Sequence, residues 1–277
     1  MTEQKTEQLR LRRINLEIWA AIIVLGLAAL VSYFLLDEHV FSWLRRHHSN
    51  WYKNNWVQVF ILLGKGWVLI WLLLSWVLAT GRPARGGPAL VAILVLLLVL
   101  PAVVSLKNIV QRPRPEDVED VIKSETKQRN AFVRSWSFPS GDAAAVFAVA
   151  TALAPFVRRQ WSITLFTISS IIGILRVAVL AHYPSDVCAG AAIGMLISWL
   201  AWQITSRCRL PEPSGFNWYR AIAAAGVVGI PLLLGLFEGI KQLLTFLKTY
   251  GVLVLGIYIA AKGGTWLKRF RRHTDTD

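Results

Sequence analysis

The chain has 277 residues, of which 55% are hydrophobic and 17% charged, and its formal net charge is +14. So low a charged fraction at this length excludes an ordinary soluble domain and indicates a polytopic membrane protein that forms one bundle. The basic residues are scattered between apolar runs. This scatter favours cytoplasmic loops and an anionic substrate over a nucleic-acid partner.

Runs of about 17 to 25 apolar residues mark the candidate membrane spans in chain order. The predicted runs are 15–36, 56–79, 88–106, 142–157, 162–181, 187–205, 221–238 and 246–262. The fourth run is short and rich in alanine, so we expect it to begin near the membrane surface. The pattern predicts an all-α transmembrane helix bundle, with residues 1–277 forming a single membrane domain.

The long predicted connection lies at about 108–138, and long loops are usually functional or disordered. Apolar residues at 118, 121 and 122 interrupt the charges in its middle. They predict either a short interfacial helix that covers a site or a solvated connector. Lys and Arg are more frequent in the segments on the side of the N-terminus, which predicts a cytoplasmic N-terminus.

Three short motifs place ionisable groups at the edges of apolar runs, all on the predicted outer side. They are Lys107-x6-Arg114-Pro115, Pro139-Ser140-Gly141-Asp142 and Arg176-x5-His182-x3-Asp186. Each alone has a plain explanation, because a histidine at a helix end is often structural and basic side chains at membrane edges snorkel. Ionisable groups at membrane depth are nevertheless rare, and a cluster of them indicates a functional site.

The residue types in these motifs suit a phosphate group. Lys107 offers a point charge, and Arg114 and Arg176 can each grip two phosphate oxygens. Backbone N–H groups of Ser140 and Gly141 at the start of a helix form a ready anion site. A neutral imidazole can accept a phosphoryl group and release it to water. Asp186, four residues after His182, could orient that imidazole if the segment is helical.

These motifs resemble the signature of the type 2 phosphatidic acid phosphatase superfamily, which includes integral-membrane lipid phosphatases. The family pattern is Lys-x6-Arg-Pro, then Pro-Ser-Gly-His, then Ser-Arg-x5-His-x3-Asp. The resemblance covers about residues 88–205 and implies a six-span core, with residues 206–277 as about two extra spans and a basic tail. It implies that His182 is the nucleophile and Asp186 its orienting partner. The implied phosphate-binding residues are Lys107, Arg114, Ser140, Gly141 and Arg176.

The chain departs from the family pattern at Asp142, where the family has a histidine credited with protonating the leaving oxygen, and at Leu175. An ordinary aspartate is ionised at neutral pH. Three readings stay open: a protonated Asp142 replaces the histidine, a phosphate leaving group needs little acid, or the site only binds lipid. Lys65, within the run 56–79, matches no motif and could either snorkel or face the substrate.

The predicted function is hydrolysis of a lipid phosphate or diphosphate through a phosphohistidine intermediate, at the outer face of the cytoplasmic membrane. The alternatives are a lipid-to-lipid phosphotransferase and a non-catalytic lipid binder or transporter with a degenerate site. The expected partners are a phosphorylated lipid and the membrane. The sequence holds no Cys/His ligand cluster, so we expect no metal and no other cofactor. Several phosphorylated lipids, including a phosphorylated glycolipid, would present the same head group.

Overall fold

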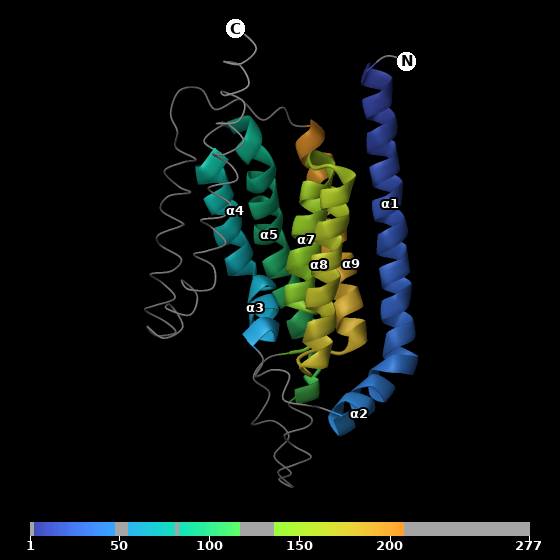
Figure 1. Ribbon diagram of the computed structural model, residues 1–277. Helices are drawn as coiled ribbons and strands as arrows, with labels where there is room; N and C mark the ends of the chain where they lie inside the picture. Colours follow the sequence, from blue (N-terminus) through green and yellow to red (C-terminus); the bar gives the residue numbers. More distant parts are fainter. Residues whose placement is uncertain (1–2, 48–54, 81–82, 117–135, 208–277) are drawn as a thin grey trace. The chain divides into compact units, whose positions relative to one another are not determined.

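The computed structural model describes residues 3–47, 55–80, 83–116 and 136–207, and the regular elements in these ranges are all helices (Figure 1). The predicted all-α class is confirmed. The elements are α1 (Glu3–Val31), the π-helical turn η1 (Ser32–Leu36), α2 (Asp37–His47), α3 (Asn55–Leu63), α4 (Gly66–Thr80), α5 (Pro83–Val110), α7 (Gly141–Leu153), the 3-10 turn η3 (Ala154–Phe156), α8 (Arg159–Ala178) and α9 (Pro184–Arg207). The predicted runs 221–238 and 246–262 and the middle of the long loop lie outside the described residues.

Four helices within the described ranges are long and apolar enough to cross a membrane. They are Gln8–His47, Pro88–Val110, Arg159–Ala178 and Pro184–Ile204, with Gly141–Phe156 as a shorter apolar helix. The predicted uninterrupted run 56–79 differs from the structure, because α3 ends at Leu63 and α4 begins at Gly66. Two glycines flank Lys65 at this break, and glycine is a poor helix former.

The chain divides into two compact units, and the motif residues all belong to the one that contains the described residues up to Gly66 and from Leu94 onward. In this unit α7 packs against both α8 and α9, and α1 packs along α9. Every residue from Ala143 to Ala152 is buried, so α7 forms the centre of the unit. The other unit contains the described residues Trp67–Ile93.

Two glycines allow α9 to approach α7 closely. A Cβ atom added to Gly194 would lie 2.1 Å from the carbonyl oxygen of Ala144, and one added to Gly190 would lie 2.4 Å from that of Ser140. Small residues at such positions let helix backbones pack in contact. The close packing fixes the beginning of α7 beside the beginning of α9, where the Ser140 N–H donates to the Asp186 carbonyl at 2.9 Å.

Candidate active site

His182 lies in the turn between α8 and α9 and is only 3% exposed. Its backbone N–H donates to the carbonyl of Arg176 at 3.2 Å, which closes the turn at the end of α8. Burial lowers the pKa of the imidazole to about 4, and the positive charges of Arg176 and Arg114 act in the same direction. The side chain is therefore neutral at physiological pH, which is the form that can act as a nucleophile.

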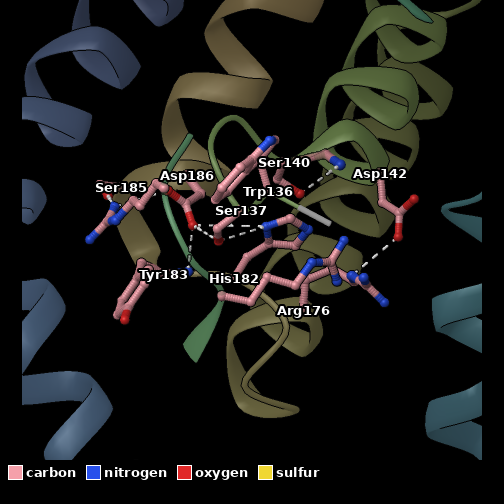
Figure 2. Close-up of polar contacts among 12 residues, drawn as sticks. Trp136, Ser137, Ser140, Asp142, Arg176, His182, Tyr183, Ser185 and Asp186 are labelled. Carbon is pink, nitrogen blue, oxygen red and sulfur yellow. Dashed lines mark hydrogen bonds and ion pairs between the residues drawn. The ribbon is translucent and has the colours of Figure 1, made fainter. Parts of the chain in front are cut away.

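Asp186, in the first turn of α9, is joined to His182 through a serine. Asp186 Oδ2 lies 3.8 Å from His182 Nδ1, beyond hydrogen-bond distance. Ser137 Oγ bridges the gap, because it donates a short hydrogen bond to Asp186 Oδ2 and lies 3.4 Å from Nδ1 (Figure 2). The Tyr183 N–H also donates to Oδ2, at 2.9 Å. Ser137 was not among the predicted site residues, although it stands two residues before the second motif.

Asp142 faces two cations. Its Oδ2 lies 3.1 Å from Arg176 Nε (Figure 2) and 3.6 Å from Lys65 Nζ. Neither Asp142 Oδ2 nor Arg176 Nε makes a hydrogen bond, although both atoms are buried. Arg176 is 7% exposed, so its ion pair with Asp142 is buried close to His182. Lys65, which matched no motif, therefore lies at the site, at the break between α3 and α4.

Lys107 and Arg114 lie on the chain that leaves the end of α5. The Lys107 ammonium donates to the backbone carbonyls of Trp136 and, at 3.1 Å, Ser137. It thus ties the end of α5 to the segment that carries the second motif. Arg114 Nη1 pairs with Glu116 at 3.4 Å. An ammonium group has three donors, so these contacts do not use all of those on Lys107.

Ser140 and Gly141 form the beginning of α7, as the sequence predicted. Ser140 is the N-cap, and its hydroxyl accepts from the Ala143 N–H at 3.4 Å. A Cβ atom on Gly141 would meet only Val103, at 3.5 Å. The positive end of the helix favours an anion there.

Two further charged residues at the site were not predicted. Arg112 contacts Asp186 Oδ1 at 2.9 Å and Asp37 Oδ2 at 2.8 Å. Arg112 stands within the first motif at a position that its pattern leaves open, and Asp37 follows the first apolar run. The rule that flags ionisable residues at membrane depth would have marked Asp37.

The structure thus brings the three motifs together at one end of the α7–α9 bundle. His182, Asp186, Asp142 and Arg176 are linked by direct contacts or through Ser137. Among the described residues, no three His, Cys, Asp or Glu side chains are grouped as metal ligands would be. The arrangement offers a neutral buried imidazole beside a guanidinium, which suits transfer of a phosphoryl group.

The segment that carries the three motifs is similar to known proteins. Residues 88–210 match the model of the PAP2 superfamily, which confirms the predicted resemblance over this segment. A lipid A 1-phosphatase of Porphyromonas gingivalis is 38% identical over 85 residues, or 30% of this chain and 19% of that protein. Lipid A 1-phosphatases of Rhizobium etli and Rhizobium johnstonii are 34% identical over 105 residues, or 38% of this chain. The chain spans less than half of these relatives, 45% and 43% for the two Rhizobium proteins. No solved structure matches the chain.

Proposed function

On the premise that residues 88–210 match the PAP2 superfamily, we propose that this protein is a membrane enzyme that removes phosphate from a phosphorylated lipid. The observation that carries the proposal is the buried His182–Ser137–Asp186 chain beside Arg176. A neutral histidine with its Nδ1 held by Ser137, which is itself bonded to the Asp186 carboxylate, directs the lone pair of Nε2 outward. This is the orientation that a nucleophilic imidazole needs.

In the proposed first step, the Nε2 lone pair of His182 forms a bond to phosphorus while the bond from phosphorus to the lipid oxygen breaks. The leaving oxygen takes the bonding electrons and a proton. The Asp186 charge, transmitted through Ser137, stabilises the positive charge that develops on the imidazole. In the second step water attacks phosphorus, the N–P bond breaks, and His182 regains its lone pair.

The charged side chains and the start of α7 would hold the phosphate oxygens. We assign this role to Arg176, Arg114 and Lys107 and to the backbone N–H of Gly141. The Ser140 N–H, which the sequence also predicted as a phosphate donor, already donates to the Asp186 carbonyl at 2.9 Å, so Ser140 acts as the N-cap of α7 instead. Preorganised donors of this kind stabilise the charge that develops during phosphoryl transfer. The proposed mechanism uses side-chain cations and backbone N–H donors, so it needs no metal ion.

We assign the proton for the leaving oxygen to the Lys65–Asp142 pair. The two groups lie 3.6 Å apart, and Asp142 occupies the position of the family's histidine. Together they hold one proton, and the Asp142 carboxyl group delivers it to the leaving oxygen. In the second step the pair takes the proton back from the attacking water, which balances the cycle.

We propose a glycolipid 1-phosphate as the first substrate to test, because the matched relatives are named lipid A 1-phosphatases. We place the site at the outer face of the cytoplasmic membrane, following the distribution of basic residues. Cysteine probes at positions 116–130 should then react with an impermeant thiol reagent from outside, and probes near 270 should not. The opposite labelling pattern would place the site on the cytoplasmic face.

The function is tested with the purified full-length protein in detergent and a panel of lipids. The panel contains lipid A with a 1-phosphate, phosphatidate, phosphatidylglycerophosphate and an isoprenoid diphosphate, with His182→Ala as the control protein. Release of free phosphate supports a hydrolase. A newly phosphorylated lipid instead indicates a phosphotransferase. Binding with neither product indicates a lipid binder and would refute the proposal.

A further inference from the structure

Asp37 is a buried carboxylate outside the segment that matches the family model. It stands at the beginning of α2 and is 1% exposed. Its Oδ1 accepts from the Ser185 N–H at 3.0 Å, and its Oδ2 accepts a short hydrogen bond from the Ser185 hydroxyl. The same Oδ2 accepts from Arg112 Nη2 at 2.8 Å. A buried charge is costly unless it is paired and hydrogen-bonded, so this full set of partners is a specific arrangement.

Arg112 connects Asp37 to the proposed active site. Its Nη1 donates to Asp186 Oδ1 at 2.9 Å and to the Ser185 hydroxyl at 2.7 Å, while Nη2 is bound to Asp37. The guanidinium carbon lies 3.9 Å from the ring centre of Tyr183. Burial alone would lower the pKa of Arg112, but the charges of Asp186 and Asp37 outweigh it and raise the pKa. A planar guanidinium holds its two Nη groups in a fixed fork, so that one faces each carboxylate.

These contacts divide the two oxygens of Asp186 between two tasks. Oδ2 accepts hydrogen bonds from the Ser137 hydroxyl and the Tyr183 N–H and thereby faces His182. Oδ1 accepts a hydrogen bond from Arg112 Nη1. Without Arg112, only the two hydrogen bonds at Oδ2 would restrain rotation of the carboxylate, and the geometry of the Ser137 bridge would be less well fixed.

We propose that Arg112 and Asp37 are positioning residues, which hold Asp186 in the orientation that supports His182. The N-terminal helices α1 and α2, which lie outside the matched segment 88–210, then form part of the catalytic unit. This inference rests on the proposed function of the same site. Arg112 between two carboxylates leaves one net negative charge, which favours the positive charge that develops on His182 during transfer.

The test is a set of single and double variants of the full-length protein, assayed for phosphate release. Arg112→Ala should lower kcat by roughly 10²-fold and change KM by less than about threefold, because the lost interaction matters most in the transition state. Asp37→Asn should lower kcat by about tenfold, since Arg112 then keeps only part of its support. Glu38→Gln and Arg46→Ala are matched controls. Both residues are exposed on α2, and the Arg46 side chain contacts its own helix at Ser42.

The decisive comparison repeats Arg112→Ala in an Asp186→Asn background. If Arg112 acts through Asp186, its loss there should lower kcat by less than about twofold, because residues that act as a unit are not additive. Equal losses in the two backgrounds would overturn the proposal. If Arg112→Ala does not fold, Arg112→Lys and Asp37→Asn give the same comparison.

An activity-independent readout separates this proposal from the proposed function. The ¹⁵N signal of His182 Nδ1 should shift in Arg112→Ala and stay unchanged when the same substitution is added to Asp186→Asn. A wild-type protein that releases no phosphate from any lipid would refute the function, while the His182 signal would still test the positioning role. An unchanged signal in Arg112→Ala would refute that role.

Discussion

The Lys65–Asp142 pair leads to a prediction that depends on the leaving group. Asp142→Asn removes the carboxylate that lies 3.1 Å from Arg176 and 3.6 Å from Lys65, and it keeps the shape of the side chain. If the pair delivers the proton, the loss should be large for a lipid monophosphate, whose leaving alkoxide needs a proton. It should be small for a lipid diphosphate, whose leaving phosphate departs as a stable anion.

Asp142→Asn should have two opposite effects, because it should slow turnover and tighten the binding of phosphate. General acid catalysis contributes roughly 10²- to 10⁴-fold, so kcat/KM for the monophosphate should fall by about that factor. The loss for the diphosphate should stay below about tenfold. Removing the carboxylate also strengthens phosphate binding at Arg176. The Asp142 carboxylate and a phosphate charge about 6 Å away would repel each other by roughly 3 kcal/mol at an effective dielectric constant near 20. Solvent screening at the partly exposed Asp142 reduces this to about 1 kcal/mol, or about fivefold tighter inhibition by inorganic phosphate.

The assay measures phosphate release from the monophosphate and the diphosphate of one isoprenoid alcohol in detergent micelles. Inorganic phosphate is added as a competitive inhibitor in a second series. Tighter inhibition together with slower turnover identifies a folded site that has lost only its proton donor. Equal losses on the two substrates would show that the Lys65–Asp142 pair does not supply the proton.

Three further predictions follow from the same geometry. His182→Ala should lower phosphate release by at least roughly 10⁴-fold, and wild-type activity should survive EDTA; loss that a divalent metal restores would exclude the mechanism. The His182 imidazole, with its pKa lowered to about 4, should stay neutral from pH 7 to pH 5 and protonate only near pH 4 in ¹⁵N-histidine spectra. Titration near 6.5 would contradict the burial argument. Gly194→Ala should lower the thermal midpoint, because its Cβ would lie 2.1 Å from a backbone oxygen, whereas Gly26→Ala has open space and should not. Equal midpoints for the two variants would refute the packing argument.

The sequence was sufficient to predict that the three motifs meet. Each motif stands at the end of an apolar run, and alternating spans bring such ends to the same side of a bundle. The N-cap role of Ser140 and the position of His182 between two helices also follow from local patterns, since a serine before an alanine-rich helix and a proline at residue 184 mark helix beginnings. These features depend on residues close together in the chain.

The contacts that complete the site depend on packing between distant segments. Asp37 reaches Ser185 across 148 positions, and no local pattern encodes such a pairing. The bridge through Ser137 depends on a side-chain rotamer and on the separation of 3.8 Å between His182 and Asp186, which residue spacing does not determine. The break at Lys65 was hidden because the flanking run is apolar enough to be read as one span.

The position of Lys65 accounts for an aspartate at position 142 in the proposed phosphate site. With a neutral histidine at position 142, the three cations Lys107, Arg114 and Arg176 would give the site a charge of +3. Asp142 lowers this charge by one and Lys65 raises it by one, so Lys65 offsets the charge that Asp142 introduces. This predicts that Asp142→His alone has low activity, because Lys65 then repels the protonated form of the new histidine, so that less of it carries the proton that the leaving oxygen needs. Adding Lys65→Met should remove that repulsion. The double variant should therefore hydrolyse a lipid monophosphate faster than Asp142→His does, and its activity should extend to higher pH. A double variant that is slower than Asp142→His, with intact binding of inorganic phosphate, would show that Lys65 acts on the phosphate independently of residue 142.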